Sequence, residues 1–127
     1  MQRTARAFAS IAAGMLAWTA MSFAQQEANP YADAEHVQAG KKLYVSAGCI
    51  ACHGGNARGA VGPDLTDDEW LRPFSIQMVY NTIANGRSGT LMSPFKGDLS
   101  DEQIWSLVSY ILDEGRKREA AGRAASR

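Results

Sequence analysis

Two cysteines and a histidine occur within five consecutive positions, Cys49-Ile50-Ala51-Cys52-His53. Two thiols separated by two residues can each add to one vinyl group of a haem, and the histidine that follows can bind the iron from the proximal side. The single motif therefore predicts one covalently attached haem c, with Cys49 and Cys52 as its thioether anchors and His53 as an axial iron ligand.

Other chemistry at this motif is less well supported by the rest of the sequence. A thioredoxin-like dithiol belongs beside a βαβ pattern, which the chain lacks. Structural zinc needs four ligands, and only Cys49, Cys52, His53 and His36 are available. A cysteine nucleophile with a neighbouring histidine does not need a second cysteine at this spacing. A Cys49–Cys52 disulfide is compatible with an exported protein, but it leaves a thin core unfilled.

A sixth ligand for the iron is expected from Met92, which lies in a loop held by glycine and proline between two expected helices. Its thioether is a soft ligand that favours reduced iron. Met78 lies within a periodic helix, where methionine usually packs, and His36 lies seventeen residues before His53. With both axial positions filled, no site is open for O2 or a substrate, so we expect electron transfer and no enzymatic activity.

Three helices are expected to position these residues. Their apolar periodicity and capping residues place them at about residues 33–47, 75–85 and 100–114. Ser100 and Gln103 form a capping box, while Gly86 and Gly115 are expected to end the second and third helices. A shorter turn is expected from Thr66 onward.

The connections are rich in glycine and proline, and no useful run of alternating strand residues is present. The pattern predicts an all-α fold with long loops. About 80 residues with three modest helices bury little of their own surface, so a haem is expected to fill the core.

Length and charge limit the function further. The chain has 127 residues, enough for one domain, and its 13 basic residues balance its 13 acidic residues. This balance gives no support to nucleic acid as a main partner.

The first 24 residues have the pattern of a signal peptide. Arg3 and Arg6 precede an uncharged segment, and Ser22 and Ala24 suit a cleavage site after Ala24. Cleavage would leave 11 basic and 13 acidic residues. The alternative is an uncleaved membrane anchor, because 18 uncharged residues nearly span a bilayer.

The two ends of the mature chain are expected to lie outside the domain. Residues 25–33 are interpreted as a polar leader and residues 34–115 as the domain itself. Residues 116–127 form a basic tail, interpreted as a frayed and solvated helix end, with docking to an acidic partner or membrane as the alternative.

The chain resembles class I mono-haem c-type cytochromes, of the small bacterial soluble kind, over about residues 34–113. The segments that carry the resemblance are Gly40-Lys41-Lys42-Leu43-Tyr44, the Cys-x-x-Cys-His motif, Gly62-Pro63-Asp64-Leu65, Met92-Ser93-Pro94-Phe95, and the helix from Ile104-Trp105 to Tyr110-Ile111.

The resemblance implies a small cytochrome c fold in which three to four helices wrap around one haem. It implies that Cys49 and Cys52 carry the haem, that His53 and Met92 are the axial ligands, and that the carbonyl group of Pro63 orients His53.

The family pattern also implies a contact between the first and last helices. Gly40 would permit their close approach, with Tyr44, Trp105 and Tyr110 packed around it. The chain departs from mitochondrial-type members in placing Cys49 five positions after Tyr44 instead of four, which predicts a one-residue bulge at Gly48.

Contacts with the haem propionates are expected from Trp70 and from Arg87 or Lys96. The alternatives are core packing for Trp70 and solvated charge for the other two, and solvated charge is preferred for Lys96.

Residues 64–70 are also similar to haem domains of cbb3-type oxidases and to cytochromes that accept electrons from quinoprotein alcohol dehydrogenases. The resemblance implies a periplasmic electron carrier between a dehydrogenase and an oxidase or another cytochrome. The alternative is a haem subunit anchored to, or part of, a periplasmic dehydrogenase or terminal oxidase. A gas sensor, in which a small gas displaces Met92, is a third hypothesis.

Overall fold

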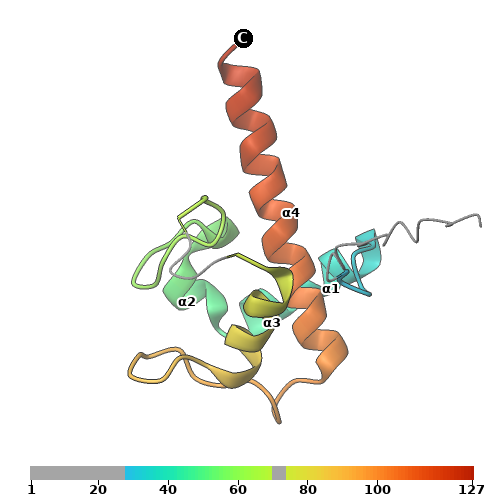
Figure 1. Ribbon diagram of the computed structural model, residues 1–127, viewed down its shortest axis with the longest axis vertical. Helices are drawn as coiled ribbons and strands as arrows, with labels where there is room; N and C mark the ends of the chain where they lie inside the picture. Colours follow the sequence, from blue (N-terminus) through green and yellow to red (C-terminus); the bar gives the residue numbers. More distant parts are fainter. Residues whose placement is uncertain (1–27, 70–73) are drawn as a thin grey trace, which may run out of the picture.

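The computed structural model describes residues 28–69 and 74–127. These residues form α1 (Ala34–Ser46), α2 (Cys49–His53), the short 3₁₀ helix η1 (Gly55–Ala57), α3 (Ile76–Asn85) and α4 (Asp101–Ala125), as Figure 1 shows. No strand occurs among the described residues, so the expected all-α class is confirmed. The expected signal segment, residues 1–24, and Trp70 lie outside them.

The contact between α1 and α4 forms the frame of the molecule. α1 begins at Asp33, whose carboxylate accepts hydrogen bonds from two backbone N–H groups of the first turn. Gly40 lies directly against the backbone of Ser106 in α4. The rings of Tyr44 and Tyr110 lie next to this crossing, with their centroids 5.1 Å apart. The expected close approach of the first and last helices is therefore present.

α3 and α4 begin at the residues expected from their capping patterns. Ser75 Oγ accepts a hydrogen bond from the N–H of Met78 at 3.0 Å. At the start of α4, Ser100 Oγ accepts from the N–H of Gln103 at 3.2 Å, and Gln103 Oε1 accepts from the N–H of Ser100 at 2.8 Å. α3 ends at Gly86, as expected. These local signals position the starts of both helices to within one residue.

α4 differs from the prediction, because it continues through Gly115 to Ala125. A glycine inside a helix costs about 1 kcal/mol, and ion pairs support the helix across this position. Lys117 Nζ lies 2.7 Å from Asp113 Oδ2 and 3.0 Å from Glu114 Oε1. The tail is thus an ordered helix, which projects beyond the rest of the molecule in Figure 1, and the frayed end was a wrong expectation.

The turn expected at Thr66 does not form a helix. Asp64 Oδ1 accepts hydrogen bonds from both the backbone N–H and the hydroxyl group of Thr66, each at 2.7 Å. Such a local side-chain bond offers the backbone an alternative to helix formation.

The core gathers apolar side chains from α1, η1, α3 and α4. Its buried members are Tyr44, Ala57, Val79, Ile83, Ala84, Ile104, Leu107, Val108, Tyr110 and Ile111. Part of the polar leader lies against α4, since Asn29 Nδ2 donates to Ser109 Oγ at 2.6 Å. Among the described residues no helix has the length and apolar character needed to cross a membrane.

Candidate haem site

The Cys-x-x-Cys-His motif forms the short helix α2, which follows α1 after a tight turn. Gly48 takes a left-handed conformation, with φ of 81°, and donates its N–H to the carbonyl oxygen of Val45 at 3.1 Å. This turn accommodates the additional position before Cys49 and agrees with the expected bulge. Cys49 is half-buried and Cys52 is exposed, and no disulfide joins the two. Burial raises the pKa of the Cys49 thiol, which is unfavourable for a cysteine nucleophile.

His53 is held through its Nδ1 atom, which lies 2.9 Å from the carbonyl oxygen of Pro63. Because a carbonyl oxygen only accepts hydrogen bonds, Nδ1 donates in this bond, which leaves Nε2 as the nitrogen that can bind a metal. The loop that carries Pro63 is itself bound to α2. Gly62 donates its N–H to the carbonyl oxygen of Cys52, and Gly59 donates to that of His53, both at 2.7 Å. His53 therefore presents Nε2 in a fixed orientation, as a metal ligand requires.

Met92 lies in a loop that is bound along the end of α3. The carbonyl oxygen of Met92 accepts from the N–H of Arg87 at 3.0 Å, and its own N–H donates to Thr90 Oγ1 at 3.2 Å. Beyond it, the N–H of Phe95 donates to the carbonyl oxygen of Ile83 at 3.1 Å. The loop is thus fixed by backbone hydrogen bonds, although it contains no regular secondary structure.

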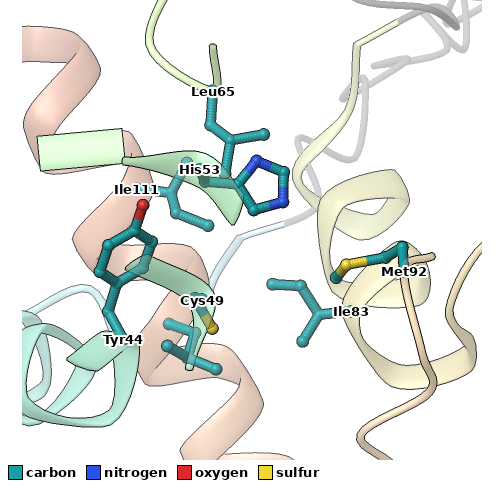
Figure 2. A pocket seen from close by; sticks show the side chains of 8 residues that line it. Tyr44, Cys49, His53, Leu65, Ile83, Met92 and Ile111 are labelled. Atoms are coloured by element: carbon teal, nitrogen blue, oxygen red, sulfur yellow. The ribbon is translucent and has the colours of Figure 1, made fainter. Parts of the chain in front are cut away.

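An apolar pocket separates His53 from Met92. Its lining comes from α1, α2, α3, α4 and two loops, and consists of Tyr44, Cys49, His53, Leu65, Ile83, Met92, Leu107 and Ile111. Figure 2 shows the Met92 sulfur pointing toward the space beside Ile83 from one side, with the His53 ring across from it. An imidazole nitrogen and a thioether across an apolar space, with a thiol at its edge, form a donor set that fits a haem.

Three of the five predicted site residues, Cys49, His53 and Met92, line this pocket. Cys52 lies exposed on the same short helix, and Pro63 contacts His53 from outside the pocket. Four apolar lining residues were not predicted as site residues, namely Leu65, Ile83, Leu107 and Ile111. Three of them lie on helices, where apolar periodicity indicates burial but does not say what the side chain faces.

The alternative ligands lie elsewhere. Met78 is not part of the pocket lining, and its sulfur accepts a hydrogen bond from Thr82 Oγ1 at 3.6 Å. His36 pairs with Asp33 at the start of α1, at 2.6 Å. In the described part of the chain, no three His, Cys, Asp or Glu side chains come together as a metal site.

An all-α fold closed by its first and last helices, with an apolar pocket beside a Cys-x-x-Cys-His helix, defines a class I mono-haem c-type cytochrome. Residues 35–111 match the model of the family described as "Cytochrome C oxidase, cbb3-type, subunit III". The chain belongs to this family. It carries a covalently bound haem c and serves haem electron transfer, and the resemblance found in the sequence is confirmed.

Similar curated proteins are subunits of oxidases. The cbb3-type cytochrome c oxidase subunit FixP of Sinorhizobium medicae is 35% identical over 94 residues, which cover 67% of this chain and 32% of that protein. Subunit CcoP of Azospirillum sp. is 37% identical over 100 residues, covering 68% and 34%. The chain thus spans about a third of the length of these relatives.

Solved structures of cytochromes share the fold. Cytochrome CL of Methylophaga aminisulfidivorans superimposes with a TM-score of 0.62 at 28% identity, covering 74% of this chain and 68% of that chain. Cytochrome cL of Hyphomicrobium denitrificans gives a TM-score of 0.56 at 30% identity, covering 61% and 46%.

Proposed function

We propose that this chain is a periplasmic electron carrier, not an enzyme, which transfers one electron at a time through a single haem c. Cys49 and Cys52 hold the haem covalently, His53 and Met92 are its axial ligands, and Pro63 orients His53. The observation that carries the proposal is the placement of His53 and Met92 across one apolar pocket. When bound, the haem supplies the reversible change of iron oxidation state.

The residues of the chain fix the position of the two ligands and keep water away from the haem. The bond from His53 Nδ1 to the Pro63 carbonyl oxygen sets the ring orientation and keeps Nε2 available. The loop bound to α3 holds the Met92 thioether in place. Apolar side chains such as Leu65 and Leu107 exclude water from the pocket. With two protein ligands in place, no open position remains for a substrate, which supports electron transfer over catalysis.

Mass spectrometry and absorption spectroscopy of protein matured in a host that attaches haem c test this proposal. We expect the intact mass of the polypeptide plus one haem, a six-coordinate low-spin spectrum, and a methionine–iron band in the oxidised state. A Cys49→Ser, Cys52→Ser double variant should lose the covalent haem. A mass equal to the polypeptide alone, or a high-spin spectrum that binds CO at once, would contradict the proposal.

A second candidate function is that of a haem subunit attached to a larger oxidase or dehydrogenase. The similar curated proteins favour this function, because they are subunits of cbb3-type oxidases. The two candidates differ in their partners and in the fate of residues 1–24. Intact mass of the exported protein distinguishes them: a mature chain that begins at Gln25 and purifies alone supports the carrier. Retention of residues 1–24, together with stable co-purification of an oxidase or dehydrogenase, supports the subunit.

In either case the expected partners are redox proteins. The propionate contacts expected from Trp70, Arg87 or Lys96 remain predictions. Arg87 lies at the start of the loop that carries Met92, and its N–H donates a hydrogen bond to the Met92 carbonyl oxygen. This position is compatible with a role at the edge of the haem.

A further inference from the structure

A basic residue of the tail helix reaches back to the loop that supports His53. Arg118 lies on α4, beyond the family match at residues 35–111. Its Nη1 group donates one hydrogen bond to Asp64 Oδ2 and another to Thr66 Oγ1, the second at 2.9 Å. The Asp64 side chain is only 20% exposed. The sequence predicts a solvated helix end for residues 116–127. Arg118 differs from this prediction, because its charge is bound to Asp64.

The residue that Arg118 binds is directly linked to the support of His53. The carbonyl group of Pro63, which accepts the hydrogen bond from His53 Nδ1, belongs to the same planar peptide unit as the nitrogen of Asp64. The proline ring fixes the φ angle of Pro63 but not its ψ angle, and rotation about ψ changes the direction of the carbonyl group. The direction of the carbonyl group therefore depends on how Asp64, at the other end of the peptide unit, is held.

Both carboxylate oxygens of Asp64 accept hydrogen bonds, and its backbone nitrogen lies close to Gly59. Thr66 donates two hydrogen bonds to Oδ1, each at 2.7 Å, while Arg118 binds Oδ2. Gly59 lies so close behind it that a Cβ at Gly59 would be 2.9 Å from the Asp64 nitrogen. Within this arrangement, Arg118 links the Asp64 carboxylate to α4 by a hydrogen bond, in addition to the apolar packing of Leu65.

The positive charge of Arg118 faces an ionised carboxylate, that of Asp64. Partial burial opposes the ionised form of Asp64, but the hydrogen bonds from Thr66 and Arg118 outweigh it and hold its pKa below the ordinary value. The carboxylate is thus ionised at neutral pH, as the ion pair requires. An exposed ion pair contributes little on its own, but a partly buried carboxylate with all these donors is a rigid unit.

We propose that Arg118 is a positioning residue for the axial histidine: by fixing Asp64, it fixes the Pro63 carbonyl group and so the ring of His53. The inference rests on the proposed function, in which His53 binds the haem iron. It makes the tail helix a part of the haem site.

The test is hydrogen exchange of the His53 Nδ1–H in the reduced, diamagnetic holoprotein, followed by NMR. Arg118→Met should speed this exchange about tenfold, because a local opening becomes easier. It should also speed exchange of the Leu65 amide, which donates to the Ala57 carbonyl oxygen at 2.8 Å. Arg118→Lys keeps the charge and should restore part of the protection.

Arg116→Met is the matched control, since Arg116 lies on the same helix, is 63% exposed and pairs only with Asp113 among the described residues. It removes the same charge and should leave His53 exchange unchanged. Asp64→Asn should speed exchange by itself, and adding Arg118→Met to it should have little further effect, since both changes remove one interaction.

The outcomes separate this inference from the proposed function. Unchanged His53 exchange in Arg118→Met, in a protein whose haem keeps its methionine–iron band, would refute the role of Arg118 alone. Equal acceleration by Arg116→Met would refute it too, because a general effect of charge would then suffice. A protein without covalent haem would refute the proposed function and this inference with it.

Discussion

The backbones of Gly40 in α1 and Ser106 in α4 are in direct contact. A Cβ atom added at Gly40 would lie 1.9 Å from the Ser106 carbonyl oxygen and 2.9 Å from the Cβ of Tyr110. Only a hydrogen atom fits at this crossing. Because Tyr44, one turn further along α1, lines the haem pocket together with Leu107 and Ile111 of α4, the contact sets the width of the site as well as the fold.

Gly40→Ala should therefore destabilise the protein by roughly 3 kcal/mol or more, since the helices must separate to admit the methyl group. Urea unfolding of the holoprotein, followed by circular dichroism, measures the change. Gly122→Ala is the control on α4, because nothing lies within 4 Å of the added Cβ. It should stabilise the protein by about 0.5–1 kcal/mol through helix propensity. Similar effects at both positions would contradict this account of the crossing.

Met92→Ala should open the sixth coordination position of the iron. We expect loss of the methionine–iron band in the oxidised protein and stoichiometric CO binding by the reduced protein, where the parent binds none. Met78→Ala is the matched control, because Met78 is also half-buried but lies outside the pocket lining. It should keep the band, at a cost in stability of about 2 kcal/mol or more for the lost packing.

The gas-sensor hypothesis predicts a different result for the same variant. If a small gas already displaces Met92 in the parent protein, Met92→Ala should change the affinity for CO little. A large gain in CO binding would speak against a sensor.

The features that could be predicted from the sequence are local ones. Asp33, Ser75 and Ser100 mark the helix starts because each cap bonds within three residues along the chain. The haem motif is likewise contiguous, and Met92 could be selected because the other methionines fall in an expected helix or in the expected signal segment.

The features that could not be predicted depend on distant partners. Gly115 is a reasonable helix end by itself. Beyond the local ion pairs of Lys117, the bonds of Arg118 to the distant Asp64 and Thr66 stabilise the helix past this position. Ala57 takes a positive φ of 60° although it has a side chain. It is fully buried, and its carbonyl oxygen accepts the N–H of Leu65. No local pattern indicates such a conformation, because the surrounding packing stabilises it.

Tyr44→Phe should destabilise the protein by about 1–2 kcal/mol. The Tyr44 hydroxyl group donates to the carbonyl oxygen of Gly54 at 2.7 Å, and the variant leaves that half-buried oxygen with the longer bond from the N–H of Ala57, at 3.3 Å. Burial raises the pKa of Tyr44, so the hydroxyl group remains protonated and can donate at neutral pH. Urea unfolding of the holoprotein measures the effect.

The control is Tyr80→Phe, which removes a hydroxyl group bonded to the exposed Asp101 at 2.6 Å. Water can replace that donor, so the expected loss is under about 1 kcal/mol. A larger loss at Tyr80 than at Tyr44 would show that the bond to Gly54 does not stabilise the end of α2.

His36 should make the stability of the protein fall as the pH rises above neutrality. Its hydrogen bond with Asp33, at 2.6 Å, raises its pKa above the ordinary value of 6.5, and Glu102 of α4 adds to the effect at 3.5 Å. The ring of Tyr31 also lies beside it. The charged imidazole thus links the start of α1 to the first turn of α4.

A raised folded-state pKa contributes stability that is fully present below the unfolded pKa of 6.5 and is lost as the pH rises through the folded value. The stability difference between the parent and His36→Gln should therefore shrink from about pH 6 to about pH 9, measured by urea unfolding in a series of buffers. Glu102→Gln should reduce the slope, because it removes one of the two carboxylates that favour the charged ring. A difference that stays constant across this range would show that folding does not shift the pKa of His36 and that its two acidic neighbours do not favour the charged ring.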